Sequence, residues 1–337
     1  MIEPQVRGML KQSFLTAVNS PGPILNLSAA GSVWAGTGLG FHPWFVCTES
    51  GALDCPQKDV LGLHFVRTAI RGALLCFRAM MAGDLLRERR FHAASTAMYY
   101  TSAFHGLDGF LASRGRVLIQ PVRGKARNQE SSSSSLLSHD PLPNNPLVIC
   151  ASVTRKGGWS FEPRRRGHTA RWAELKQLVS MKGSTLPSSV LNALAYASMR
   201  EKTDDLNLLL SDGIPALAGL RHQALYEGFG YDDDAYDALV NRVNPYGVGL
   251  DGRNEALREL SLGLLDASLV VAEFFFNWCD ECKGSSDLTA LVQRVAVSTF
   301  HPAFEFDLAR PDDIPNSINQ RVQGMVDRLE PSFNTNN

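Results

Sequence analysis

Three side chains in the second half of the chain combine phosphate binding with proton transfer. Arg221, His222 and Tyr226 occur in GLRHQALYEG, near the end of a helix expected over residues 217–227. An arginine can hold a phosphate with two parallel hydrogen bonds, and a histidine can transfer a proton near neutral pH. A tyrosine titrates near ~10, so it is a weak general base at pH 7. The alternative is structural, with Arg221 in an ion pair with an acid such as Asp237.

A second group of candidates lies in a locally basic segment, residues 114–171. This segment holds eleven Lys or Arg and three acidic residues, so its net charge is +8 in a chain of net charge −1. Such a patch is typical of polyanion binding, and aromatic side chains within it can stack on unpaired bases. We therefore expect RNA to be bound by Arg123, Lys125, Arg127, Trp159, Arg164, Arg165 and Arg166. The alternative is a solubilising loop packed against the protein's own acidic surface.

Two long helices are expected before the basic segment. The first begins at residue 60, and the second covers residues 84–113. A turn at residues 82–83 would make them an antiparallel hairpin. The first helix has an apolar stripe at spacings of three and four: Leu63, Val66, Ile70, Leu74 and Phe77. A different face is basic: His64, Arg67, Arg71 and Arg78. That basic face either meets water or, in a sharper interpretation, contacts phosphate.

The other elements are expected to be short strands and further helices. Residues 1–57 are rich in Gly, Pro and Ser, so we expect an irregular segment. Strands are expected at residues 117–120, 147–153 and 159–162. Helices are expected at residues 172–181, 187–200, 255–282 and 318–329. The helix over 255–282 has an acid every seven residues, which we interpret as its water-facing side: Glu259, Asp266, Glu273 and Asp280.

Composition and motifs exclude several classes of protein. Apolar residues make up 44% of the chain and charged residues 20%, which indicates a globular protein with a core. The most apolar stretch, residues 262–278, contains two acids, too many for a membrane span. The N-terminus has no signal-peptide pattern, so we expect a cytoplasmic protein with reduced thiols. Cys279 and Cys282 lack partners at ordinary zinc spacing, and Asp232 to Asp234 fit a helix start. We expect no metal and no cofactor.

The segment RFHAASTAMYYTSAFHGLDGFLASRGR, residues 90–116, resembles the signature helix of the HEPN superfamily, named for higher-eukaryote and prokaryote nucleotide-binding domains. Small and aromatic residues carry the match: Ala97, Tyr99, Tyr100, Ala103, Phe104, His105, Leu111 and Gly115. GHTARWAELKQLV resembles the start of the family's third helix, and LRHQALYEGFG falls where its arginine motif falls. The resemblance covers roughly residues 60–240.

This resemblance implies an all-α bundle that forms a homodimer and cuts RNA without a metal. The family uses an arginine, the polar residue beside it, and a histidine five positions after the arginine. Here Arg221 takes the arginine place and His222 the polar place, while Tyr226 replaces the histidine. Since His222 and Tyr226 are four residues apart on one helix face, His222 can act as the base with Tyr226 as hydrogen-bond donor. The alternative is an inactive, binding-only site. His105 and Asp108 either line the same groove or simply pack there.

We therefore predict a mainly α fold, an HEPN-like antiparallel bundle with an inserted basic, partly β loop and extra C-terminal helices. Its parts would be an N-terminal segment over 1–57, the bundle over 58–245 with its insertion at about 116–166, and a C-terminal extension over 246–337. The expected function is RNA or nucleotide engagement, as a metal-independent endoribonuclease of a prokaryotic toxin or defence system. The alternative is a catalytically inactive helical scaffold that assembles with a partner protein.

Overall fold

The structure, a computed structural model, describes residues 2–19, 46–47, 53–55, 58, 61–119, 147–165, 167–180, 250–282, 286–299 and 314–329. Within these ranges the chain is mostly helical, with one three-stranded sheet and one two-stranded pair. The predicted mainly α character is therefore confirmed. No helix in the described ranges is long and apolar enough to cross a membrane.

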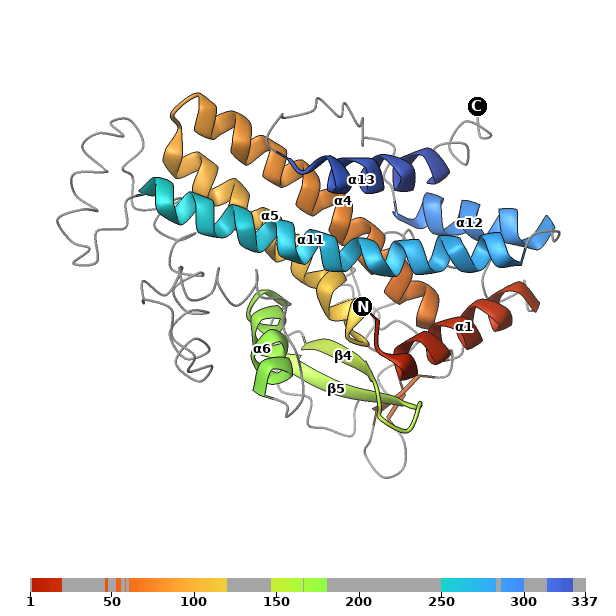
Figure 1. The fold of residues 1–337 in the computed structure, drawn as a ribbon. Coiled ribbons are helices and arrows are strands. Elements are labelled where there is room, and N and C mark those ends of the chain that lie inside the picture. Colours follow the sequence, from red (N-terminus) through yellow and green to blue (C-terminus); the bar gives the residue numbers. More distant parts are fainter. Residues whose placement is uncertain are drawn as a thin grey trace, which may run out of the picture.

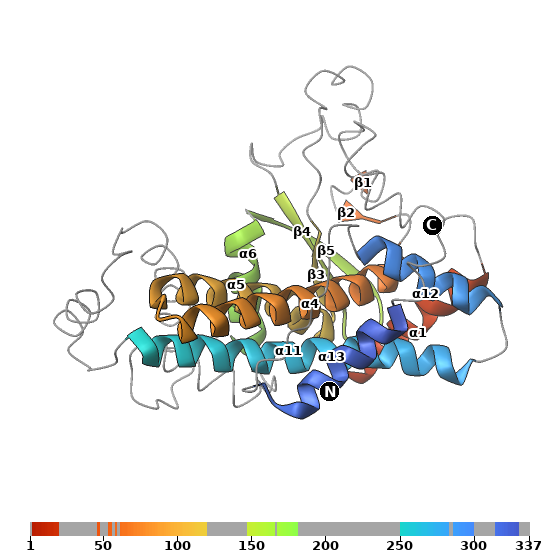
Figure 2. The same ribbon diagram turned by 90° about the horizontal axis from the view of Figure 1, so that it is seen from above.

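Three long helices form the centre of the fold (Figure 1). Helices α4 (Leu61–Glu88) and α5 (His92–Ser113) form an antiparallel hairpin, and α11 (Leu250–Glu281) lies along both. The view from above in Figure 2 shows the same three helices side by side. The apolar stripe predicted for α4 is buried, and its apolar residues share one core with those of α5 and α11. Burial of these apolar faces is the main source of the bundle's stability.

The turn of the hairpin lies at residues 89–91, and the predicted turn at residues 82–83 is wrong. Gly83 is buried inside α4, and a Cβ placed there would lie 2.7 Å from ring atoms of Tyr99. The glycine therefore permits a close approach of the two helices and does not end one. Arg90 closes the turn with a φ of 64°, in the left-handed region.

A small antiparallel sheet follows the hairpin. Strand β3 (Arg116–Ile119) pairs with β4 (Leu147–Val153), which pairs with β5 (Trp159–Arg165). The three predicted strands are confirmed, with β5 extending three residues beyond its predicted end. Helix α6 (Gly167–Ser180) begins next and packs against the sheet and α5. A further two-stranded pair joins β1 (Val46–Cys47) to β2 (Leu53–Asp54).

An N-terminal helix, α1 (Pro4–Asn19), occupies part of the segment predicted to be irregular, so that prediction is wrong for these residues. Val6, Leu10, Phe14 and Ala17 recur at spacings of four and three and are all buried. The Phe14 ring lies 5.2 Å from the ring of Phe275 on α11. The helix therefore forms because its apolar face docks on the bundle.

The acidic stripe of α11 is covered in part by α13 (Asn316–Leu329), near the C-terminal end of the fold. Arg321 forms ion pairs with Asp266 and Glu273, and Arg328 forms one with Asp280. The side chains of these three acids stay 57%, 41% and 42% exposed, so the stripe still faces water beside α13, and Glu259 is exposed as well. Helix α12 (Ser286–Thr299) packs against α4, α1 and α13.

Candidate functional site

The predicted catalytic residues Arg221, His222 and Tyr226 lie outside the described residues, and so does Asp237. Four of the predicted RNA-binding residues also lie outside them: Arg123, Lys125, Arg127 and Arg166. Strand β5 contains Arg165, whose backbone alone is described. The structure therefore describes the helices that precede the arginine motif, together with the side chains of Trp159 and Arg164.

Most of the described basic side chains of the segment 114–171 make ion pairs within the chain, whereas Arg155 and Lys156 are exposed between β4 and β5. Glu174 on α6, whose side chain is 1% exposed, pairs with both Arg116 of β3 and Arg164 of β5. Arg164 also contacts Glu162 at 2.6 Å. A buried carboxylate between two guanidinium groups joins the sheet to α6. Of the two interpretations of this segment, these pairs favour packing against the protein's own acids.

The aromatic side chains of this segment are also engaged internally. The Trp159 ring lies 5.3 Å from the Phe65 ring of α4. Trp172 is buried and donates a hydrogen bond of 3.1 Å from its indole nitrogen to the Tyr100 hydroxyl. A buried indole cannot stack on a base without leaving its site, so Trp172 is not a stacking platform in this conformation.

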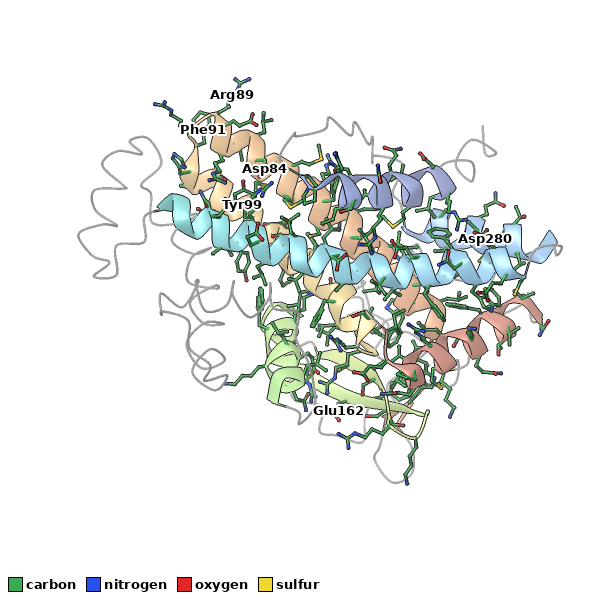
Figure 3. The ribbon with its side chains drawn as sticks, viewed as in Figure 1. Asp84, Arg89, Phe91, Tyr99, Glu162 and Asp280 are labelled. Carbon is green, nitrogen blue, oxygen red and sulfur yellow. The ribbon has the colours of Figure 1, made fainter. Side chains whose placement is uncertain are left out.

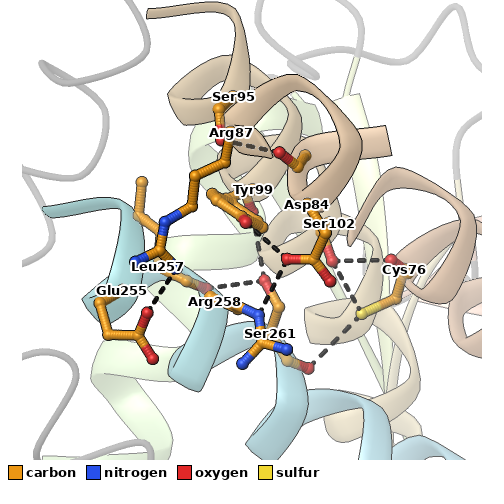
Figure 4. Close-up of polar contacts among 11 residues, drawn as sticks. Cys76, Asp84, Arg87, Ser95, Tyr99, Ser102, Glu255, Leu257, Arg258 and Ser261 are labelled. Atoms are coloured by element: carbon orange, nitrogen blue, oxygen red, sulfur yellow. Dashed lines mark hydrogen bonds and ion pairs between the residues drawn. The ribbon is translucent and has the colours of Figure 1, made fainter. Parts of the chain in front are cut away.

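A buried polar network joins the three central helices near the hairpin turn (Figure 4). The Tyr99 hydroxyl and the Arg258 Nε both donate to the same carboxylate oxygen of Asp84, at 2.5 and 2.9 Å. Each of the three residues comes from a different helix, α5, α11 and α4 respectively. The other oxygen of Asp84 has no partner among the described residues. Burial, with the Asp84 carboxylate beside it, raises the pKa of Tyr99, so the phenol stays protonated and cannot act as a base.

The network continues along the helices as hydroxyl and thiol contacts. Ser102 donates to the Cys76 carbonyl at 2.7 Å, and Ser261 of α11 donates to the Tyr99 carbonyl at 3.2 Å. Burial raises the pKa of the Cys76 thiol to about 12, which leaves it protonated and unreactive. These contacts fix the register of α4, α5 and α11, so we assign the network a structural role. Sequence reasoning missed it, because nothing in the sequence pairs Asp84 with a residue so far along the chain.

A second cluster lies where α4, α5 and α6 meet and surrounds His105, which is half-buried. A Cβ placed on Gly72 of α4 would lie 2.8 Å from the His105 carbonyl oxygen, so the two helix backbones are in close contact here. Arg171 of α6 forms an ion pair with Asp108, and its guanidinium lies 4.5 Å from the centre of the Phe104 ring. The structure therefore brings His105, Asp108 and Arg171 together.

The imidazole of His105 is held in its neutral form. Burial lowers the pKa of His105, the Asp108 carboxylate opposes that effect, and the charges of Arg171 and Arg71 add to it. A neutral imidazole beside guanidinium groups can accept a proton, and the guanidinium groups can hold an anion. Imidazole and guanidinium groups are the ones that proton transfer and phosphate binding use, which is the chemistry that the sequence predicts for the arginine motif.

Sulfur and carboxylate groups give no further site within the described ranges. Cys55, Cys76, Cys150, Cys279 and Cys282 are free thiols. The described residues contain no group of three His, Cys, Asp or Glu side chains placed to hold a metal ion.

Comparison of the chain with protein-family models, with curated proteins and with solved structures gave no match. Its function therefore has to be argued from its own residues.

Proposed function

We propose that this chain is an HEPN-like protein that engages RNA or nucleotides and cuts RNA without a metal. The observation that carries the proposal is the cluster around His105, on the helix whose sequence resembles the family's signature. A half-buried neutral imidazole there lies near Arg71 and beside the ion pair of Asp108 with Arg171. A polar side chain so placed, on the helix that resembles the family's signature, favours a phosphate-handling groove over simple packing.

In this proposal the arginine motif completes the site. Arg221 holds the scissile phosphate with its two-pronged guanidinium group and neutralises the charge that develops on it. His222 accepts the proton of the ribose 2′-hydroxyl, and Tyr226 donates a hydrogen bond to a phosphate oxygen. A homodimer would bring two such sets together. The proposed setting is the cytoplasm, in a toxin or defence system.

The test is cleavage of a pool of labelled RNAs by the full chain with EDTA present. We expect cleavage by the original protein and by Arg89→Ala, which removes an exposed arginine from the hairpin turn. Arg221→Ala should lose it. A control with the same sequences as DNA should stay intact, because DNA lacks the attacking 2′-hydroxyl. If the original protein leaves every RNA intact, the enzyme proposal is wrong.

A second candidate function is a catalytically inactive scaffold that assembles with a partner protein. Two exposed apolar side chains near the hairpin turn favour it: Leu85, in the last turn of α4, is 56% exposed, and Phe91 is 58% exposed. Figure 3 shows Phe91 at the turn. Large apolar side chains exposed together often mark a protein contact. Phe91→Ser would then abolish partner capture without changing the melting temperature. A partner retained by this variant would contradict the scaffold proposal.

A further inference from the structure

The basic face of α4 contains an arginine, Arg67, that has no partner among the described residues. Arg67 is half-buried, and no carboxylate or other group in the described part of the chain makes a hydrogen bond or ion pair with it. Arg71 lies one helical turn further on and is exposed. The other arginines that approach the interior differ. Arg116, Arg164, Arg171 and Arg258 each have a carboxylate partner.

Physical chemistry makes such an arginine unusual. Taking a guanidinium group partly out of water costs free energy unless an anion compensates it, and an arginine does not escape the cost by losing its proton. Burial, together with the charge of Arg71, lowers the pKa of Arg67 to about 10, yet the group stays charged at neutral pH. Two cations one turn apart also repel each other. An anion between them would relieve both effects.

The described charged groups around Arg67 and Arg71 are also mainly positive. Gly72, next to Arg71, brings α4 against the backbone of His105 and Gly109 on α5. The Arg71 charge acts on His105, and Arg171 pairs with Asp108, the one carboxylate that influences this histidine among the described residues. Counting described side chains alone, the three guanidinium groups of Arg67, Arg71 and Arg171 against this one carboxylate give a net charge of +2. The neutral His105 imidazole can donate a hydrogen bond to an oxygen atom there.

We propose that Arg67 and Arg71 of α4, with His105 close to Arg71, form an anion site that takes a phosphate group. Arginines suit this ligand because the guanidinium fork matches two phosphate oxygens. The phosphate can belong to an RNA backbone or to a mononucleotide or free phosphate. The site shares Arg71 and His105 with the cluster of the proposed function and deepens that proposal, but it would bind phosphate whether or not Arg221 supports cleavage.

The experiment measures binding to the full chain by calorimetry in phosphate-free buffer. The probes are inorganic phosphate, adenosine monophosphate and a short single-stranded RNA. We expect Arg67→Gln to weaken binding by at least about tenfold, the size of effect that one charged hydrogen bond gives. The matched control, Arg89→Gln, removes one exposed arginine from the same hairpin and should change affinity less than about twofold.

The three probes identify the source of the phosphate. Arginine-dependent binding of inorganic phosphate or the mononucleotide would indicate a free or terminal phosphate. Binding of RNA alone would indicate a backbone phosphodiester, and either outcome supports the site. The proposal is overturned if Arg67→Gln binds every probe as the original does, or if the original binds none.

A stability measurement separates a ligand role from a structural one. Without phosphate, Arg67→Met should melt at or above the temperature of the original protein, because it keeps the apolar stem and removes an uncompensated charge. Phosphate should raise the melting temperature of the original but not of this variant. A clear loss of stability in Arg67→Met would show that Arg67 serves the fold instead. Arg221→Ala should bind phosphate as the original does, so failure of the cleavage proposal would leave this one standing.

Discussion

The buried carboxylate of Asp84 gives the most sensitive test of how the three central helices are held together. Its side chain is 6% exposed, and that of its partner Arg258 is 9% exposed. Asp84→Asn keeps an oxygen that can accept from Tyr99 but removes the charge that compensates Arg258. Removing one partner of a buried ion pair typically costs about 3–5 kcal/mol. Because one neutral hydrogen bond survives, we expect a loss of about 3 kcal/mol in the free energy of unfolding.

The matched control is Asp280→Asn on the same bundle (Figure 3). Asp280 and Arg328 form an ion pair whose side chains are 42% and 40% exposed. An exposed pair contributes less than about 1 kcal/mol, so this variant should unfold almost as the original does. Urea denaturation followed by circular dichroism measures both variants. Combining Asp84→Asn with Arg258→Met removes both charges and should recover about 2 kcal/mol. Equal losses in the two asparagine variants, or additive losses in the combined variant, would refute the reasoning.

Three further predictions follow from other buried groups. Glu174→Gln should lower the free energy of unfolding by about 3 kcal/mol in urea denaturation, because two arginines lose the buried carboxylate that they share. A loss below about 1 kcal/mol would contradict this prediction. A thiol reagent should modify the exposed Cys282 well before Cys76, since burial raises the pKa of the Cys76 thiol to about 12; equal rates would show that the bundle opens readily. Burial lowers the pKa of His105 below 6.5, so the unfolded chain binds this proton more readily. The free energy of unfolding should therefore fall as the pH drops below about 6.5. His105→Gln should flatten this part of the plot of stability against pH.

The sequence predicted those elements whose signals are local. Apolar spacing located α4, and alternating or β-branched residues located the three strands of the sheet. The turn of the hairpin was placed wrongly because Gly83 has two possible meanings, a helix end or a close helix contact. Only the position of the Tyr99 ring distinguishes them. Helix α1 was missed because the many Gly, Pro and Ser residues after it obscured the spacing of Val6, Leu10 and Phe14.

The contacts that decide the chemistry were the hardest to predict, because they join distant parts of the chain. Asp84 and Arg258 are separated by 174 positions, and Arg116 and Glu174 by 58. No spacing rule relates such pairs. The sequence therefore indicated an RNA-binding surface in the basic segment, although four of its arginines have internal carboxylate partners. The basic face of α4 was visible in the sequence. The structure adds that Arg67 on this face is half-buried without a carboxylate among the described residues.

The most direct test of the proposed function is the rate of RNA cleavage by the full chain in EDTA, compared with that of Arg221→Ala. The account predicts metal-independent cleavage that falls by about a hundredfold or more in the variant, as expected when a group that stabilises the transition state is removed. His222→Ala should fall by a similar factor, since it would remove the general base. Equal rates for the original and Arg221→Ala, or no cleavage by either, would contradict the proposal that this chain is an RNase.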